Sequence, residues 1–455
     1  MTGFFTSAAA FIVAIAILVA VHEWGHYIVA RMLGVKVLRF SVGFGRVLWS
    51  RRYGADRTEF CLSAIPIGGY VKLLDERDCA VPLDEQHRAF NRQTGRTKIA
   101  ILSAGPIMNF IFAVLAYWGM FVLGVPGAKP IIGEIEPQSI AASAGIVMGD
   151  RVLRVGDRRV ETWEGTILAM LTELLADGDI PLDVIGEDGH ERSVVLKTAG
   201  KETELTEPGQ LFTGIGMRPW SPQLPPVIDT VTPEGPAAGA GLTSGDLIVS
   251  ADGEPVTSWP AWVDYIRARP NQGIEVTVLR GTTEVALYLE IGEAESGSET
   301  IGRIGASVQV PEELLETLRA EQRYGVMEAL TRAVSKTADM MLLTVRMVVS
   351  MVMGDVSVKN ISGPINIAQY AGLSVSIGFA QFLSFLAIVS ISLGILNLLP
   401  IPMLDGGQIF YTLVEGAKGS PMSERAQLVG QQMGILFLLI LMSFAVYNDL
   451  SRIFG

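Results

Sequence analysis

The chain has 455 residues and a formal net charge of −12 at pH 7, and 49% of its residues are hydrophobic. Its length indicates more than one domain. The apolar content is high for a soluble protein, and the negative charge argues against nucleic acid as a partner.

Four clusters of apolar residues have the length of membrane spans. A helix needs about 20 residues to cross the hydrocarbon core of a bilayer, and the segments near this length are about 5–33, 99–125, 375–399 and 428–447. No Lys or Arg precedes the apolar core of the first segment. This argues against a cleaved signal peptide, so we expect an uncleaved anchor with its N-terminus outside.

Three ionisable side chains interrupt the first apolar segment, in the sequence His22-Glu23-Trp24-Gly25-His26. On a helix the two histidines lie one turn apart on the same face. This is the H-E-x-x-H pattern, in which two imidazoles bind zinc and the glutamate acts as general base. Ionisable groups are costly in a bilayer and are usually kept there for function. The structural alternative is a polar cluster that only packs helices together.

Charge is distributed unevenly between the two long connections. Residues 34–98 carry 12 Lys and Arg against 7 Asp and Glu, whereas residues 127–310 carry 13 Lys and Arg against 28 Asp and Glu. Basic loops remain in the cytoplasm, so we expect the first connection inside and the acidic region outside. Cys61 and Cys79 belong to the inner loop, where reduced structural thiols are expected, and no Cys pair has zinc-finger spacing.

The outer region contains an internal repeat at an offset of 96 residues. Nine of 29 aligned positions are identical between residues 135–163 and 231–259, including the pairs Gly149-Asp150 and Gly245-Asp246. Each copy predicts a strand, a short Ala-rich helix, a Gly-Asp turn, two β-rich runs and a helix near the Trp. A period near 100 residues indicates two whole α+β domains.

The repeated core resembles PDZ domains of the bacterial periplasmic type, which share the pattern A-x-x-A-G-[ILV]-x-x-G-D. PDZ domains bind extended peptides by adding a strand to a sheet edge. Gly214-Ile215-Gly216 is a candidate loop for a peptide carboxylate, because glycines leave backbone N–H groups accessible. The alternative is that the two domains form a steric shield without a ligand.

Residues 340–353 are apolar but too short for a comfortable span, and they include Arg346. We expect an amphipathic helix at the membrane surface or against the neighbouring domain. If this segment spanned the membrane, everything after it would change sides.

A catalytic zinc ion usually takes three protein ligands, so the two histidines of the first span need a third partner. His87 and His190 are poor candidates; the E-x-x-H string that ends at His190 coincides with a turn signal in the outer region, which argues against a di-iron site. Asp405 follows the third span. It therefore reaches the same, cytoplasmic part of the bilayer as His22.

Asp405 belongs to the motif Asn397-x-x-Pro400-x-Pro402-x-x-Asp405-Gly406. The prolines end a helix and free backbone groups where a site needs them. Alone, this motif is typical of a helix-ending turn. Paired with H-E-x-x-H at matching depth, it indicates a metal site.

Together these motifs resemble the site-2 protease family of intramembrane zinc proteases. The likeness covers essentially the whole chain and includes S-A-G-P-x-x-N-F at 103–110 and S-G-P at 362–364. It implies one Zn²⁺ per chain, held by His22, His26 and Asp405. Glu23 is then expected to take a proton from water and pass it to the leaving amine.

The resemblance also implies the reaction and its setting. The expected reaction is hydrolysis of peptide bonds within transmembrane segments of pre-trimmed single-span proteins, such as an anti-sigma factor or signal-peptide remnants, in regulated intramembrane proteolysis. The expected location is a bacterial inner membrane, with the N-terminus and PDZ domains in the periplasm and the active site toward the cytoplasm. Membrane lipid and periplasmic peptides are further expected partners.

For substrate binding, the resemblance implies Asn397, beside Pro400 and Pro402, as a group that binds the substrate backbone. It further implies a membrane-associated β-hairpin within residues 39–70, where Gly43-Phe44-Gly45 lies between strand-like runs. The open edge of such a hairpin can pair with an extended substrate. The alternative for the two glycines is a plain turn.

Two other classes of protein compete with a protease. A PDZ-bearing scaffold with an inert metal motif leaves Glu23 and Asp405 unexplained. A transporter also carries polar groups at membrane depth, but the spans are unequal and show no inverted repeat.

The predicted fold class is a polytopic α-helical membrane protein with four transmembrane helices, two tandem α+β PDZ domains and a membrane-associated β-hairpin. The predicted regions are the first span (1–34), the β-loop region (35–98), the second span (99–125), the PDZ domains (127–222 and 223–310), amphipathic helices (311–374), the third span with its L-D-G motif (375–411) and the fourth span (427–448).

Overall fold

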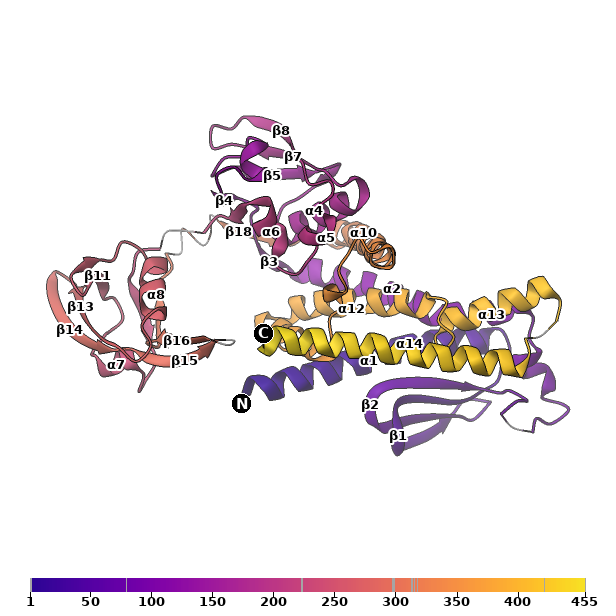
Figure 1. Cartoon of the computed structure of the whole chain (residues 1–455). Helices are drawn as coiled ribbons and strands as arrows, with labels where there is room; N and C mark the ends of the chain where they lie inside the picture. Colours follow the sequence, from indigo (N-terminus) through magenta and orange to yellow (C-terminus); the bar gives the residue numbers. More distant parts are fainter. Residues whose placement is uncertain are drawn as a thin grey trace.

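The computed structural model describes residues 2–78, 80–221, 224–296, 299–311, 314, 316, 318–420 and 422–454. A body of long helices carries a small β-sheet near one end, and two α+β domains lie outside this body (Figure 1). Cys79 lies outside the described residues, whereas Cys61 is a buried free thiol.

Among the described residues, four helices are long and apolar enough to cross a membrane: α1 (Thr2–Met32), α2 (Gly95–Leu123), α12 (Phe379–Leu398) and α14 (Glu424–Phe454). Helix α2 packs against α1 and α12, and 44% of its most apolar window is buried, against 11% for α14. Helix α2 is therefore central and α14 peripheral.

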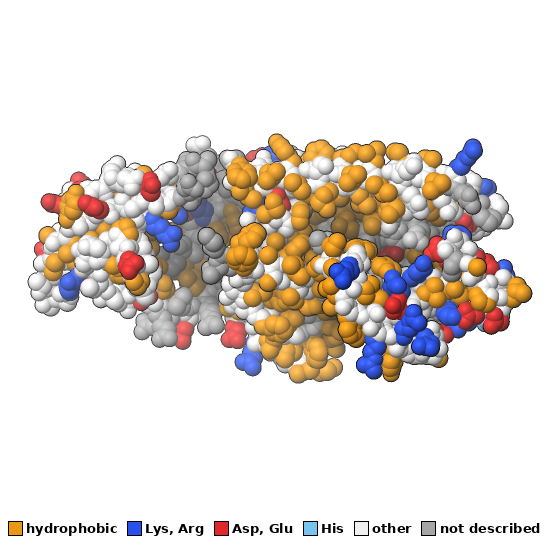
Figure 2. All heavy atoms as spheres, turned by 90° about the horizontal axis from the view of Figure 1, so that it is seen from below, with side chains coloured by type: hydrophobic (Ala, Val, Ile, Leu, Met, Phe, Trp, Pro, Cys, Tyr) orange, Lys and Arg blue, Asp and Glu red, His pale blue; other side chains and the backbone are white. Residues whose placement is uncertain are grey.

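The surface of the helical body is apolar. Figure 2 shows hydrophobic side chains covering its middle, whereas charged side chains gather over the sheet end on the right and on the outer domain on the left. Exposed apolar side chains include Leu115 of α2 and Phe437 of α14, which are 52% and 50% exposed. A continuous apolar surface of this kind matches a hydrocarbon environment.

Three further helices complete the body: α10 (Val326–Met353), α11 (Pro364–Ile377) and α13 (Asp405–Lys418). Helix α10 is not among the four candidate spans. Its Ala329, Ala333 and Thr337 are buried at four-residue spacing, and the helix packs against α2 and α12 on one side and α4 of the first outer domain on another. Short 3₁₀ turns occur at η1 (Gln86–Arg88), η2 (Phe90–Arg92) and η3 (Val358–Asn360).

The small sheet is formed by β1 (Val37–Tyr53) and β2 (Thr58–Leu73), which fold over each other. Residues 39–42 pair with 69–72 on one side and with 59–62 on the other. Residues 39–42 are therefore interior to the sheet. Gly43 and Gly45, at φ of 92° and 82°, bend a strand that continues to Tyr53. Among the described residues, the edge without a strand partner on the α1 side is residues 69–73.

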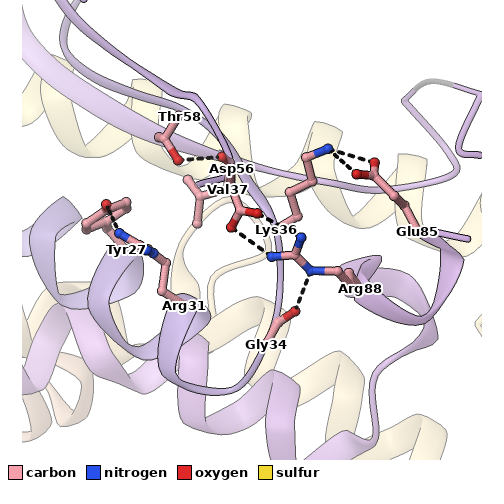
Figure 3. Close-up of polar contacts among 9 residues, drawn as sticks. All are labelled: Tyr27, Arg31, Gly34, Lys36, Val37, Asp56, Thr58, Glu85 and Arg88. Atoms are coloured by element: carbon pink, nitrogen blue, oxygen red, sulfur yellow. Dashed lines mark hydrogen bonds and ion pairs between the residues drawn. The ribbon is translucent and has the colours of Figure 1, made fainter. Parts of the chain in front are cut away.

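A polar network fixes this sheet to the end of α1 (Figure 3). Arg88 donates to both carboxylate oxygens of Asp56 at 2.7 Å and to the Gly34 carbonyl at 3.3 Å. The Thr58 hydroxyl donates to the Val37 carbonyl at 2.8 Å. Since the ion pair is bidentate and half-buried, it resists sliding of the sheet relative to α1.

The chain leaves and re-enters the helical body through a two-stranded ribbon, β3 (Val125–Ala128) and β18 (Arg319–Gln322), which pair antiparallel. The first outer domain comprises β4 (Ile132–Ile135), α3 (Ile140–Ser143), β5 (Arg151–Val155), β6 (Arg158–Arg159), α4 (Trp163–Asp177), β7 (Ile180–Ile185), β8 (Glu191–Leu196), α5 (Glu202–Leu205), α6 (Gln210–Ile215) and β9 (Met217–Pro219).

The second outer domain comprises β10 (Ile228–Val231), α7 (Pro236–Gly239), β11 (Leu247–Ala251), β12 (Glu254–Pro255), α8 (Trp259–Arg267), β13 (Gly273–Arg280), β14 (Thr283–Glu290), β15 (Gly292–Ser296), β16 (Glu299–Arg303) and β17 (Ala306–Val308). Its four-stranded sheet has the order β12-β11-β13-β14, which corresponds to β6-β5-β7-β8 in the first domain. The sequence repeat is thus also a repeat of topology.

A buried aspartate has the same role in both outer domains. Asp150 and Asp246 are fully buried, and each accepts a hydrogen bond from the backbone N–H three residues before it at 2.9 Å. Asp150 pairs with Arg192 and Asp246 with Arg280. The arginines are 88 residues apart and the aspartates 96, so an ungapped match finds only the aspartates.

Candidate metal centre

The structure brings together three side chains from opposite ends of the chain. His22 and His26 lie one turn apart on α1, and Asp405 is the first residue of α13. The Nε2 atoms of the histidines are 3.2 Å apart, and Asp405 Oδ2 lies 3.1 Å from the first and 3.4 Å from the second. All three ligand atoms lie within 4.8 Å of one another.

The local sequence explains how Asp405 reaches this place. Helix α12 ends at Leu398, before the two prolines, and the backbone turns before α13 begins. A Cβ at Gly406 would lie 2.2 Å from the Leu398 carbonyl oxygen, and one at Gly407 would lie 2.2 Å from the Ile401 carbonyl oxygen. Only glycines therefore allow α13 to start so close to the end of α12.

Helix α2 orients the second histidine and leaves space at the ligand atoms. His26 Nδ1 donates to the Ile101 carbonyl at 2.8 Å, so the lone pair of its neutral ring is on Nε2. A Cβ at Gly105 would lie 2.3 Å from His26 Nε2 and 2.8 Å from His22 Nε2. The absence of a side chain at Gly105 is what keeps this space open.

The donor set fits zinc. Two imidazole nitrogens and one carboxylate oxygen converge, with both histidines only 8% exposed, and three protein ligands are typical of a catalytic zinc site. His190 lies in the first outer domain, where its side chain is 81% exposed beside Asp188.

The side chain of Glu23 extends from α1 toward the open edge of the small sheet. Its carboxylate faces the Val71 backbone N–H. A Cβ at Gly69 would lie 3.3 Å from Glu23 Cγ and 2.7 Å from Val19 Cγ1. The strand can approach the helix this closely because residue 69 is glycine.

A family model described as Peptidase family M50 matches residues 10–441. The chain belongs to peptidase family M50. The Regulator of sigma-E protease RseP of Escherichia coli (strain K12) is 39% identical to it over 457 residues, and the Regulator of sigma E protease of Salmonella typhi is 40% identical over 464 residues. A Putative zinc metalloprotease of Vibrio cholerae is 39% identical over 455 residues. Each of these alignments covers 100% of both chains.

These relatives confirm the predicted resemblance, which within the family points to the regulator of sigma-E protease. This M50 peptidase is an intramembrane zinc metalloprotease, so the alternatives of a scaffold and of a transporter are wrong. A solved PDZ domain of an SdrC-like protein from Listeria monocytogenes aligns with 24% of this chain and all of that domain, at 18% identity and a TM-score of 0.17. That likeness is too slight to assign a fold.

The remaining predicted residues of the M50 peptidase lie at different distances from the centre. Asn397 Nδ2 is 3.5 Å from His22 Nε2, so its amide borders the ligand atoms. Pro400 and Pro402 lie in the turn between α12 and α13. A Cβ at Gly434 of α14 would lie 3.3 Å from Pro402 Cδ, so the turn also packs against the peripheral helix.

The two predicted glycine segments are outside the metal centre. Phe44 stacks on Tyr70 with ring centroids 6.2 Å apart and lies 44% exposed in the bend between Gly43 and Gly45. In the first outer domain, Gly214 and Ile215 are the last residues of α6, and Gly216 caps the helix at φ 75°.

The sequence did not single out Ile101 or Gly105 as parts of this site. Ile101 acts through a backbone carbonyl, and Gly105 acts through the lack of a side chain. The only available signal was the glycine in the S-A-G-P motif of the second span.

Proposed function

We propose that His22, His26 and Asp405 hold one zinc ion, and that this centre cleaves peptide bonds within transmembrane segments of membrane proteins. The observation that carries the proposal is the convergence of the three ligand atoms within 4.8 Å. Both histidines lie within a candidate membrane span, Phe4–Met32. A site at this depth meets substrates whose scissile bond is itself in the membrane.

In the proposed mechanism, zinc when bound polarises the scissile carbonyl and makes the attacking water more acidic. The carboxylate of Glu23 takes the proton from this water and returns it to the leaving amine nitrogen. The Val71 N–H faces that carboxylate. The Ile101 carbonyl holds the His26 ring, so its Nε2 stays directed at the site.

A transmembrane helix must unwind before it can be cut, because its carbonyls are hydrogen-bonded and the bilayer offers no replacement. We propose that the edge at residues 69–73 supplies that replacement by pairing with the extended substrate. This edge is supported by its position, because a Cβ at Gly69 would lie 3.3 Å from Glu23 Cγ. The Gly43-Phe44-Gly45 bend is proposed to contribute through Phe44, which stacks on Tyr70 of this edge. Asn397, which has both a donor and an acceptor, is proposed to bind the substrate backbone on the other side.

The decisive experiment compares two variants of the full-length protein in detergent. Glu23→Gln is expected to retain stoichiometric zinc by elemental analysis but to lose cleavage of a single-span substrate. His22→Ala is expected to lose both. Robust cleavage by Glu23→Gln would refute the role of the glutamate, and retention of zinc by His22→Ala would refute the metal centre.

We propose an orientation with the N-terminus and both outer domains in the periplasm and the metal centre toward the cytoplasm of a bacterial inner membrane. The charge distribution supports it, since residues 34–98 are basic and 127–310 acidic. The names of the relatives support an anti-sigma factor as substrate. Membrane lipid is the proposed partner of the apolar surface of α1, α2, α12 and α14.

We further propose that the outer domains are PDZ domains and that the second one binds an extended peptide. A cleft of about 700 Å³ lies between α8 and β17, and its lining includes Trp262, Ile266 and Ile304. In the first domain, Phe212 of α6 packs edge-on against Trp163, with centroids 5.2 Å apart. Helix α6 therefore covers the corresponding surface.

This difference bears on the proposed carboxylate loop. Gly214-Ile215-Gly216 closes α6, and Ile215 is fully buried. The counterpart in the second domain is Gly305, at φ 73°, which lines the open cleft. Binding of a labelled C-terminal peptide to the full-length protein tests the proposal. If no peptide binds, the alternative of a steric shield that excludes bulky substrates is favoured.

A further inference from the structure

The metal centre has a second layer of contacts on α2, of which the proposed reaction uses only the Ile101 carbonyl. Ile101, Gly105 and Asn109 are spaced by four residues and so share one face of the helix. This face lies against the two histidines. The Ile101 carbonyl accepts from His26 Nδ1, and Asn109 Nδ2 lies 3.1 Å from His22 Nδ1.

The Asn109 side chain has an unusual environment. The residue is fully buried, and its Oδ1 has no hydrogen-bond partner among the described residues. Buried amide oxygens are seldom left without a partner. Because nothing on the far side fixes the amide, a half-turn about Cβ–Cγ is free to bring Oδ1 to the position of Nδ2, beside the His22 ring.

The chemistry of imidazole decides which atom of the amide His22 needs. A neutral imidazole has one N–H and one lone pair. Nε2 of His22 faces His26 Nε2 at 3.2 Å and Asp405 Oδ2 at 3.1 Å, so Nε2 must keep its lone pair in order to act as a ligand. The proton is then on Nδ1, where it needs an acceptor, and the amide of Asn109 is the group beside it.

We propose that Asn109 is a positioning residue whose Oδ1 accepts the Nδ1–H of His22 and so holds the lone pair of that ring on Nε2, directed at the metal position. This inference rests on the proposed zinc site. His26 is held in the same way by a backbone carbonyl. Helix α2 thus sets the tautomer and the orientation of both histidine ligands, and partners of this kind strengthen metal binding.

The test measures the zinc affinity of the full-length protein in detergent by competition with a fluorescent chelator. Asn109→Leu is expected to weaken zinc binding about 10- to 100-fold, because leucine cannot accept a hydrogen bond. Asn109→Asp keeps an oxygen acceptor and is expected to bind zinc with close to the original affinity. If Asn109→Leu is not recovered folded, Asn109→Ala replaces it with the same expectation.

Ser390→Ala is the matched control. The Ser390 hydroxyl of α12 donates to the Asn109 backbone carbonyl at 2.8 Å. Ser390→Ala therefore removes a different contact of Asn109 and leaves its contact with the imidazole in place. This control is expected to retain zinc affinity.

Three outcomes overturn the proposal: unchanged affinity in Asn109→Leu, an equal loss in Ser390→Ala, or an equal loss in Asn109→Asp. A parallel measurement on His22→Ala separates this inference from the metal centre itself. If His22→Ala loses zinc and Asn109→Leu does not, only the role of Asn109 is refuted.

Discussion

Replacing Gly105 by alanine tests the geometry of the metal centre most directly. The added Cβ would lie 2.3 Å from His26 Nε2 and 2.8 Å from His22 Nε2, whereas ordinary contact begins at 3.4 Å. The rings must therefore retreat by about 1.1 Å and 0.6 Å from α2. Overpacking of this kind costs about 1–3 kcal/mol, which corresponds to roughly a five- to 150-fold loss of zinc affinity, since about 1.4 kcal/mol is tenfold.

The same substitution does not weaken the helix itself, because alanine is favoured over glycine in a helix by about 1 kcal/mol. Gly119→Ala on the same helix is the control, since its Cβ would meet only the movable end of Leu383 at 3.2 Å. Zinc affinity is measured by chelator competition and activity by cleavage of a single-span reporter. If Gly105→Ala binds zinc within about twofold of the parent, the ligand atoms do not lie where the structure has them.

Three further predictions concern other parts of the molecule. Val71→Pro removes the N–H that faces the Glu23 carboxylate, at an edge where proline is tolerated. Cleavage is expected to fall at least about tenfold with zinc retained, and unimpaired cleavage would contradict the role of this edge. In the second outer domain, hydrogen bonds from Arg280 lower the pKa of Asp246 below its usual 3.8. The unfolded chain therefore binds protons more readily than the folded one. The stabilisation is full above the unfolded-state pKa and is lost as the pH falls from there through the lower folded-state pKa. Thermal unfolding between about pH 1 and 5 is expected to show a flatter acid limb in Asp246→Asn, and an unchanged limb would refute this. Removal of zinc by a chelator is expected to abolish cleavage reversibly and to lower the unfolding temperature. The stability lost is up to about 4 kcal/mol, relative to the protein at a zinc concentration a thousandfold above Kd. Cleavage that survives chelation would count against a metal-dependent reaction.

The ligand atoms could be anticipated from the sequence because two regular rules apply. The helical period places His22 and His26 on one face, and the number of residues that each span crosses brings Asp405 to the same depth. Neither rule applies to Ile101 or Gly105. Ile101 acts through its backbone carbonyl and Gly105 through the lack of a side chain, and neither property follows from a pattern of residue types. These two contacts could therefore be found only from the structure.

In the small sheet, the strands could be predicted from the sequence but their arrangement could not. Alternation of apolar residues predicts strands in residues 39–70 but does not say that the chain folds back far enough to cover residues 39–42 on both sides. In the outer domains, the buried aspartates could be predicted from the repeat but their arginine partners could not. Asp150 and Asp246 align in the repeat, but the loops before Arg192 and Arg280 differ in length, so pairing across the domain could not be inferred from one offset.

The ribbon formed by β3 and β18 makes the outer domains an insertion whose two ends lie side by side. Ala128 and Arg319 are paired neighbours, and the Lys129 N–H donates to the Leu318 carbonyl at 2.9 Å. The cut ends would therefore already be adjacent if everything between them were excised and a short turn put in its place. The two covalent connections between the helical body and the outer domains thus lie side by side, while α10 also packs against α4 of the first outer domain. Changes in the outer domains are therefore tolerated as long as they preserve this second contact.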